Sequence, residues 1–431
     1  MENKPRDTPL LFKKYPSLNS EVPWIPLLDN VPTPIDQLTE LEREFNINPP
    51  GGLYIKRDDK DHQIYGGNKL RKFEFIFGRI LEQNKKGVMT FGGIGTNHGL
   101  ACAIIAKELG IKCELFLANQ PITWHVQRSL LLYDYFNANI HYAKSYTGIV
   151  LKALGFRLIH PSYYLMLPGG STLLGFGSPI GTVGFINAVC ELAFQIKQGD
   201  IPEPDVIYVP CGSGGTAAGL IAGCKLLNLK TRVHAVAVST DLFANKSSII
   251  KNANKTLKYL NKCDNSIPAI EIESEDFELI EGYLGSDYGV KTQRGQHAVD
   301  LVMKLEGKRR GFKLETTYTG KAMAAMLDYI RKEKHKSNTV LFWNTYNSNN
   351  LDDYVRKTQF NYENLPKNLQ KVYNDHQFQC WKIKECDIYK ECAAYLNHEY
   401  RCWKIKQCSE ATRNQCEVYK TLKNEVQLED S

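Results

Sequence analysis

The sequence predicts an α/β protein with parallel sheets flanked by helices, divided into two domains and followed by a small cysteine-rich C-terminal module. Strand-like and helix-like segments alternate along the chain. Two glycine-rich turns follow apolar strands, and the composition changes near the end of the chain. With 431 residues, the chain is long enough for more than one buried core.

Short apolar runs and longer helical runs follow one another in the order that parallel sheets require. The predicted strands are 87–93, 112–119, 205–210, 232–239 and 338–345, and the predicted helices are 99–110, 216–227 and 321–334. Residues 1 to about 55 contain many prolines, so we expect a loop-rich lead-in there.

Composition excludes several classes of protein. A hydrophobic share of 43% and a charged share of 23% are ordinary for a globular enzyme and exclude a largely disordered chain. A net charge of +7 over a chain of this length is too small to indicate a nucleic-acid partner. The N-terminus lacks the apolar core of a secretory signal, and prolines interrupt the uncharged stretch 158–190, so we expect a cytoplasmic protein without a membrane span.

The turn CGSGGTAAG at 211–219 joins a predicted strand to a predicted helix. Gly212, Gly214 and Gly215 let the backbone approach an anion closely, and Ser213 and Thr216 add hydroxyl groups. The pattern favours a phosphate cradle, and a tight turn that binds nothing is the alternative. A nicotinamide dinucleotide is a rival ligand, but the G-x-G-x-x-G spacing and the acidic residue after the next strand are both missing.

Lys69 follows a Gly-Gly turn in the segment GGNKLRK. A lysine at the start of a helix can be held with a defined direction, which Schiff-base chemistry requires. Burial or nearby cations would lower its pKa, and Arg71 and Lys72 are candidates for such cations. A solvated surface lysine is the alternative.

Six motifs in order carry a resemblance: GGNKLRK, GTNHG, PGGSTLLG, GSGGTAAGL, YGVKTQRG and YTGKAMAAM. Together the set resembles the pyridoxal-phosphate enzymes that include D-cysteine desulfhydrase and 1-aminocyclopropane-1-carboxylate deaminase, in the tryptophan-synthase-β-like group. The resemblance covers roughly residues 20 to 350 and is specific, because several spaced motifs agree.

The resemblance implies roles for individual residues. Lys69 matches the lysine that binds the cofactor as a Schiff base. Thr96 matches a residue that contacts the substrate carboxylate, and Asn97 one beside the cofactor ring oxygen. The remaining matches are the phosphate loop (Gly212, Ser213, Gly214, Gly215 and Thr216), two active-site tyrosines (Tyr288 and Tyr318), and Thr345 as a hydroxyl partner of the pyridine nitrogen.

The resemblance also implies the fold and the reaction. It indicates a two-domain fold type II pyridoxal 5'-phosphate enzyme. The large, cofactor-binding domain would contain residues 1–76 and 187–365, and the small domain residues 77–186. The implied activity is a lyase or deaminase that removes the Cα proton of a small amino acid and eliminates a β substituent. The implied assembly is a homodimer.

Three departures from the family pattern bear on the substrate. Thr96 stands where the family usually has Ser. Asn344-Thr345-Tyr346-Asn347 replaces the usual His-Thr-Gly-Gly. Thr319 follows Tyr318 where the deaminase type has Glu, which points away from the cyclopropane substrate. These departures keep open an alternative function, a non-catalytic sensor that binds the cofactor and an amino acid.

Residues 370–431 form a separate cysteine-rich module with an internal repeat. The segments CWKIKEC at 380–386 and CWKIKQC at 402–408 differ at one position. Clustered thiols in a cytosolic protein favour zinc or an iron–sulfur cluster, with disulfides or surface thiols as alternatives. The candidate ligands are Cys380, Cys386, Cys392, Cys402, Cys408 and Cys416. The other six cysteines are expected to pack in the core.

Overall fold

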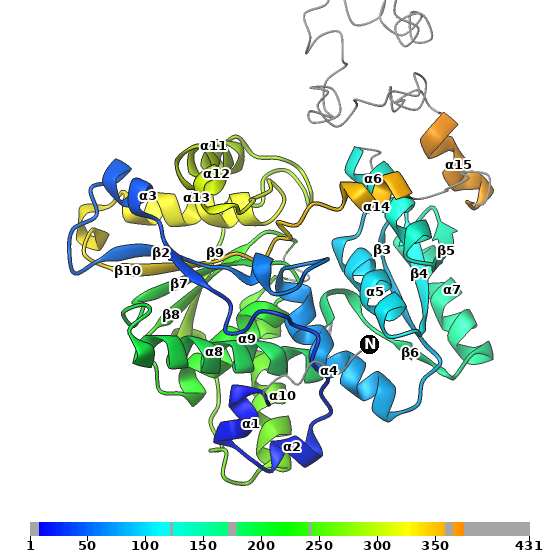
Figure 1. Cartoon of the computed structure of the whole chain (residues 1–431), viewed down its shortest axis with the longest axis horizontal. Coiled ribbons are helices and arrows are strands. Elements are labelled where there is room, and N and C mark those ends of the chain that lie inside the picture. The colour runs from blue at the N-terminus through cyan, green and yellow to red at the C-terminus, as the bar shows by residue number, and fades with distance from the viewer. Residues whose placement is uncertain (1–7, 121–123, 171–178, 241–243, 358–364, 375–431) are drawn as a thin grey trace, which may run out of the picture. The chain divides into compact units, whose positions relative to one another are not determined.

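The computed structural model describes residues 8–120, 124–170, 179–240, 244–357 and 365–374 (Figure 1). The described residues fall into two compact units. The first contains those up to Thr90, Ala101–Cys113 and Phe156–Asp353, and the second contains Phe91–Leu100, Glu114–Gly155 and those from Tyr354 onward. No helix among the described residues has the length and apolar character needed to cross a membrane.

The first unit is built on a six-stranded sheet with the order β1-β2-β10-β7-β8-β9. β1 is antiparallel to β2, and every other neighbouring pair is parallel. The strands are β1 (Ile35–Gln37), β2 (Gly52–Lys56), β7 (Val206–Cys211), β8 (Arg232–Ala237), β9 (Phe277–Ile280) and β10 (Thr339–Trp343). The carboxyl ends of the parallel strands therefore share one edge, where ligands bind in such sheets.

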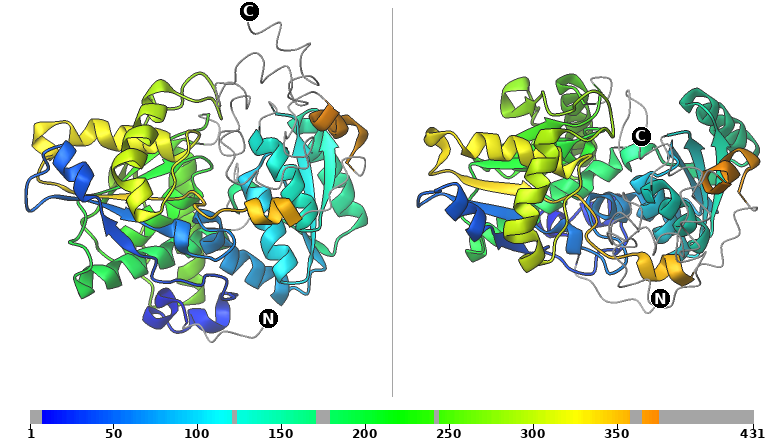
Figure 2. Two further views of the ribbon diagram at one scale, coloured as in Figure 1. Left: turned by 45° about the horizontal axis from the view of Figure 1, so that its top comes forward. Right: turned by 90° about the horizontal axis from the view of Figure 1, so that it is seen from above.

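Helices cover both faces of this sheet, as Figures 1 and 2 show. On one face, α8 packs against α4 and α9, and on the other, α11 packs against α13. The helices of this unit are α1 (Leu10–Lys14), α2 (Leu18–Glu21), α3 (Thr39–Glu44), α4 (Asn68–Glu82), α8 (Ile180–Gln198), α9 (Gly215–Leu226), α10 (Lys246–Cys263), α11 (Gln293–Val302), α12 (Lys308–Arg310) and α13 (Thr319–Ile330). The predicted α/β class with helix-covered parallel strands is confirmed.

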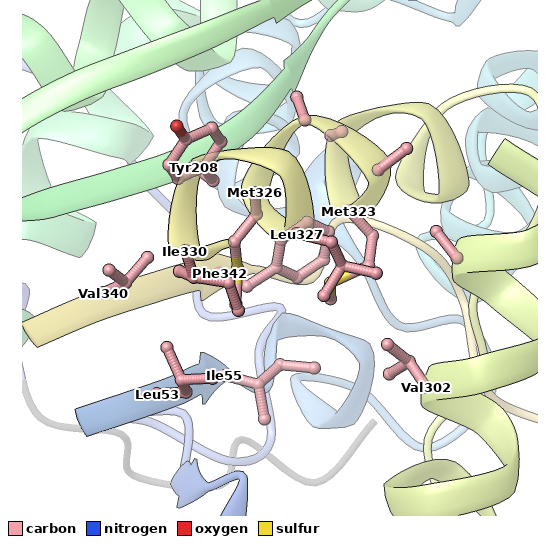
Figure 3. Packing of buried hydrophobic residues seen from close by; sticks show 14 of the residues in the cluster. Leu53, Ile55, Tyr208, Val302, Met323, Met326, Leu327, Ile330, Val340 and Phe342 are labelled. Carbon is pink, nitrogen blue, oxygen red and sulfur yellow. The ribbon is translucent and has the colours of Figure 1, made fainter. Parts of the chain in front are cut away.

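A cluster of buried apolar side chains joins the sheet to α13 (Figure 3). Leu53 of β2, Tyr208 of β7 and Phe342 of β10 lie against Met326 and Ile330 of α13. Full burial of one such side chain contributes about 1.5–3 kcal/mol. This cluster fixes the strands whose carboxyl ends carry the site described below.

The expectation of a loop-rich lead-in over the first 55 residues is wrong in part. The segment contains α1, α2, β1 and α3, and β2 begins within it at Gly52. β2 lies inside the sheet, between β1 and β10. The segment GLYIK is short and starts after two prolines, and its parallel partner β10 lies far along the chain, so local pattern alone does not indicate the strand.

A second sheet has four strands in the order β5-β4-β3-β6, and β3 and β6 pair in parallel. Its strands are β3 (Gly87–Gly93), β4 (Lys112–Ala118), β5 (Ala138–Ala143) and β6 (Tyr163–Leu165). The remaining helices are α5 (Asn97–Glu108), α6 (Trp124–Tyr135), α7 (Tyr146–Ile159), α14 (Asp352–Lys357) and α15 (Lys367–Asn374). Tyr354 of α14 has its ring 5.4 Å from the rings of Tyr135 and Phe136.

Candidate functional site

The Gly66–Gly67 turn sets the start of α4 and therefore the position of Lys69. Gly67 has φ +106°, a backbone conformation that side chains disfavour, and a Cβ there would lie 2.6 Å from the carbonyl oxygen of Thr345. The Gly66 N–H donates to Asn347 Oδ1 at 3.0 Å, and the Asn68 N–H donates to the Thr345 carbonyl at 3.2 Å. The turn is thus seated on the loop that follows β10.

The Lys69 amine is held inside this unit and connected to the glycine loop by one side chain. Lys69 Nζ donates to Asn68 Oδ1 at 2.7 Å, and Asn68 Nδ2 donates to Thr216 Oγ1 at 3.0 Å. Burial lowers the pKa of Lys69 to about 8, and the negative charge of Glu315 opposes that shift. The structure therefore brings Lys69 and the predicted phosphate cradle together.

The glycine loop joins the carboxyl end of β7 to the first turn of α9. Gly214 has φ +78° and directly precedes the helix. The first N–H groups of a helix have no acceptor within it, and the helix dipole adds positive potential there. The Ser239 hydroxyl donates to the Gly212 carbonyl at 2.8 Å, which fixes the loop from the end of β8. This arrangement suits a phosphate group.

Lys72 is a second buried amine beside this site that the sequence did not identify as a binding residue. It lies one turn after Lys69 on α4 and donates to the Gly169 carbonyl at 2.7 Å. Burial, together with the charge of Lys69, lowers the pKa of Lys72 to about 7. The sequence signal for Lys72 was its position three residues after Lys69, which places both side chains on the same side of a helix.

Arg71 does not act as the neighbouring cation that the sequence suggested. Its guanidinium is buried and pairs with Asp58 at 2.8 Å and Glu191 at 3.0 Å. Those partners belong to the structural core beneath the turn. Burial, and not either candidate cation, lowers the pKa of Lys69, whereas the charge of Lys69 contributes to the lowered pKa of Lys72.

Tyr288 and Tyr318 come together although 30 residues separate them. Their hydroxyl groups are in hydrogen-bond contact, and their ring centroids are 5.9 Å apart at 76°. The Tyr318 ring also lies against the glycine loop, since a Cβ on Gly212 would be 3.3 Å from Tyr318 Cε1. The Tyr318 ring therefore lies beside the glycine loop, and Tyr288 is held next to it.

Glu315 organises the segment that carries Tyr318, and sequence reasoning missed it. Its carboxylate accepts the N–H groups of Thr317 at 2.6 Å, Tyr318 at 2.9 Å and Thr319 at 2.8 Å. Thr319, the position at which the deaminase type has Glu, is buried, and its hydroxyl accepts the Glu315 N–H at 2.8 Å. An acidic residue shortly before a predicted helix was the only signal available.

Thr96 and Asn97 belong to the second unit. Thr96 Oγ1 accepts the Gly99 N–H at 3.3 Å, and the Thr96 carbonyl accepts the Tyr133 hydroxyl at 3.1 Å. α5 begins at Asn97, so Thr96 serves as the cap of that helix. The roles that the resemblance implies for both residues stay predictions.

The cysteines outside the C-terminal module are packing residues, as expected. Cys102, Cys113, Cys190, Cys211 and Cys224 are buried and Cys263 is half-buried, and all are free thiols. Burial raises the pKa of Cys211 to about 12, which keeps its thiol neutral beside the cradle. Within the described part of the chain, no three His, Cys, Asp or Glu side chains are grouped to hold a metal ion. The six cysteines of the module lie outside the described residues.

Comparison with known proteins identifies relatives over most of the chain. Residues 27–345 match the family described as pyridoxal-phosphate dependent enzyme. D-cysteine desulfhydrase of Klebsiella pneumoniae (strain 342) is 31% identical over 329 residues, which cover 74% of this chain and 92% of that protein. D-cysteine desulfhydrase of Salmonella newport (strain SL254) is 30% identical over 328 residues, with the same coverage of both chains.

Solved structures give a consistent result. A homologue of 1-aminocyclopropane-1-carboxylate (ACC) deaminase superposes with a TM-score of 0.64 at 27% identity, over 82% of this chain and all of that one. A pyridoxal 5'-phosphate-dependent aspartate racemase superposes with a TM-score of 0.52 at 16% identity, over 82% of this chain and 97% of that one, which shows a shared fold.

Proposed function

Because this chain belongs to the family of pyridoxal-phosphate-dependent enzymes, we propose that it is a lyase that eliminates a β substituent from a small amino acid, as D-cysteine desulfhydrase does. With cysteine and one water molecule, the products would be pyruvate, ammonia and sulfide. The observation that carries the proposal is the amine of Lys69, joined through Asn68 to Thr216 of the glycine loop.

The residues present fit the cofactor. The loop from Gly212 to Thr216 offers backbone N–H groups and a helix N-terminus to a phosphate, and Lys72 offers a cation whose charged form is destabilised until an anion arrives. Lys69 would hold the cofactor covalently, and Asn97 and Thr345 would contact its ring. When bound, pyridoxal phosphate supplies an electron sink that acidifies the substrate Cα–H and permits loss of a β leaving group.

Lys69 would act as the base at Cα. With a pKa of about 8, roughly a tenth of its amine is neutral at pH 7, far more than for an ordinary lysine. Asn68 fixes the direction of the amine through its hydrogen bond. Glu315, through its charge, limits how far the pKa of Lys69 falls.

The tyrosine pair would serve the leaving group. Tyr288 and Tyr318 share one hydrogen-bond contact, so one hydroxyl can pass a proton to the departing thiolate while the other supports it. Thr96 would contact the substrate carboxylate. Thr319 in place of Glu favours a thiol-bearing substrate over the cyclopropane one. We also retain the domain division at residues 1–76 with 187–365 and 77–186, and the homodimer, as predictions.

Turnover of D-cysteine tests this function. The purified protein with pyridoxal phosphate should release pyruvate and sulfide in equal amounts from D-cysteine, and Lys69→Ala should abolish this while the exposed-lysine control Lys60→Ala keeps it. No product from D-cysteine, L-cysteine or 1-aminocyclopropane-1-carboxylate, with a spectral change on adding the amino acid, would overturn the lyase and favour the non-catalytic sensor.

For the C-terminal module we propose a metal role for the repeated cysteines. Thiolates are preferred ligands of zinc and of iron–sulfur clusters. The support is compositional, since Cys380, Cys386, Cys392, Cys402, Cys408 and Cys416 lie close together in the sequence. Elemental analysis of the purified chain should find zinc or iron in stoichiometric amount, and metal-free protein would reject the proposal.

A further inference from the structure

α7 carries apolar side chains on two opposite sides. Ile149 and Ala153 are buried on the inner side. The outer side carries a row of exposed apolar residues that we call the α7 stripe. Its members are Val150, Leu151, Leu154 and Leu158, with exposed fractions of 36%, 66%, 47% and 85%.

The spacing of the α7 stripe places its members on one side of the helix. Positions 150, 154 and 158 follow each other at intervals of four, and Leu151 lies beside them. Ile159, at the end of the same helix, is 76% exposed. A helix that is apolar around most of its circumference is normally covered on all sides, and contiguous exposed apolar residues mark an interaction surface. We therefore expect another segment or molecule to cover the α7 stripe.

The C-terminal tail is the part of this chain that the family comparison does not account for. The family match ends at residue 345, and the D-cysteine desulfhydrases cover 74% of the chain. Residues 375–431 follow α15, the last described helix, which belongs to the same compact unit as residues 146–155 of α7. At about 3.3 Å per residue, a segment of this length can reach any surface of its own unit.

The chemistry of the tail suits an apolar helix surface. Each repeat places Trp and Ile between lysines, at Trp381 and Ile383 in the first and at Trp403 and Ile405 in the second. A tryptophan side chain buries about 150–250 Å² when it packs against apolar neighbours. The tail thus offers two matched apolar anchors, and a second copy seated on the stripe is an outcome that the test below distinguishes.

We propose that the α7 stripe is the docking surface for the tail of the same chain, with Trp381 and Trp403 packed on Leu151, Leu154 and Leu158. The inference is independent of the proposed lyase activity, because it shares no residue with the Lys69 site, and it does not require the tail cysteines to bind a metal. It explains two features that the cofactor chemistry does not use, namely the exposed α7 stripe and the repeated Trp-containing motif of the tail.

Photocrosslinking in the full-length protein tests the proposal. The photoreactive residue p-benzoylphenylalanine replaces Leu154, and the control carries it in place of Lys258, an exposed residue of α10. After irradiation, we expect a product of monomer mass in which position 154 is joined to a peptide from residues 375–431. Crosslinking to α7 of a second molecule, or a yield no higher than the Lys258 control, would overturn the proposal.

Variants in the tail test whether the tryptophans themselves hold the tail on the α7 stripe. Trp381→Ala combined with Trp403→Ala should lower the crosslink yield from position 154 about tenfold, since the two largest apolar contacts are lost. Lys382→Ala combined with Lys404→Ala, beside the same tryptophans, should leave the yield unchanged. Equal yields in both double variants would contradict the role of the tryptophans.

Discussion

Lys69 and Lys72 lie one turn apart on α4, and burial lowers the pKa of both amines. Two neighbouring amines of this kind are costly in a folded protein, because burial disfavours the charged form of each, and the charge of Lys69 further disfavours that of Lys72. Lys69 donates to an amide oxygen and Lys72 to a backbone carbonyl. An anion bound at the nearby glycine loop would remove this cost, which explains why the chain keeps both residues at this position.

The neutral fraction of Lys69 predicts the pH dependence of cofactor uptake. In the cofactor-free protein the reacting species is the neutral amine, so the rate of covalent uptake should rise with pH and level off above about pH 8. Glu315 raises the pKa of Lys69, so Glu315→Gln should move the bend to lower pH, and the exposed control Glu333→Gln should not. The visible absorption of the bound cofactor measures the rate. A rate that still climbs beyond pH 9 would contradict a lowered pKa.

Lys72→Met should change stability and cofactor affinity in opposite directions. The folded-state pKa of Lys72, about 7, lies below the unfolded value of 10.5, so the folded state is penalised below pH 10.5 and most strongly below pH 7. Met keeps the volume without the charge. It should stabilise the cofactor-free protein by on the order of 4 kcal/mol at pH 7 and by about half as much at pH 9.

The same variant should bind pyridoxal phosphate about tenfold more weakly, because one cation near the phosphate is lost. Urea unfolding at the two pH values and a cofactor titration measure these effects, and Lys60→Met is the exposed control. A variant that is less stable than the parent at pH 7 would contradict the claim that the charge of Lys72 destabilises the cofactor-free protein.

The Gly66–Gly67 turn is the element on which the site depends most. Gly67→Ala forces a side chain into a positive φ and against the Thr345 carbonyl, which should cost about 1–3 kcal/mol and displace the start of α4. The variant should lose stability and cofactor content together. Gly155→Ala, a helical position with no atom within 4 Å of the added Cβ, should be neutral or slightly stabilising. Thermal unfolding and cofactor absorbance measure both; a stable Gly67→Ala protein with full cofactor would refute the argument.

The elements that sequence reasoning identified are those with a strong local pattern. The strands at 87–93 and 205–210 are apolar runs that lead into glycine-rich turns, and a helix-forming run follows each. The structure confirms them as β3, β7, α5 and α9. β2 was missed because its partner β10 is almost 300 residues away, as their pairing shows.

The same limit applies to the candidate site. Lys69 and the glycine loop stand out as motifs, whereas the contributions of Lys72 and Glu315 depend on contacts between distant segments. Glu315 acts on Lys69 from the segment before α13, and Lys72 contacts Gly169 across about a hundred residues. No spacing in the sequence reports those contacts.

The whole chain combines a family core with an addition. The core gathers site residues from four segments: the start of α4, the β7–α9 loop, the segment before α13 and the loop after β10. These segments meet at or beside the carboxyl edge of one sheet. The C-terminal tail lies outside the family match. The proposed cofactor chemistry explains the site residues of the core, and the proposed docking on α7 explains the tryptophans of the tail.

The most direct test of the central claim is to locate the lysine that carries the cofactor. The purified protein is saturated with pyridoxal phosphate, reduced with borohydride to make the attachment permanent, digested, and mapped by peptide mass spectrometry. We predict one modified position, Lys69, and no stoichiometric modification in Lys69→Ala. A modification at Lys72 or at any other lysine in place of Lys69, or no modification at all, would contradict the account.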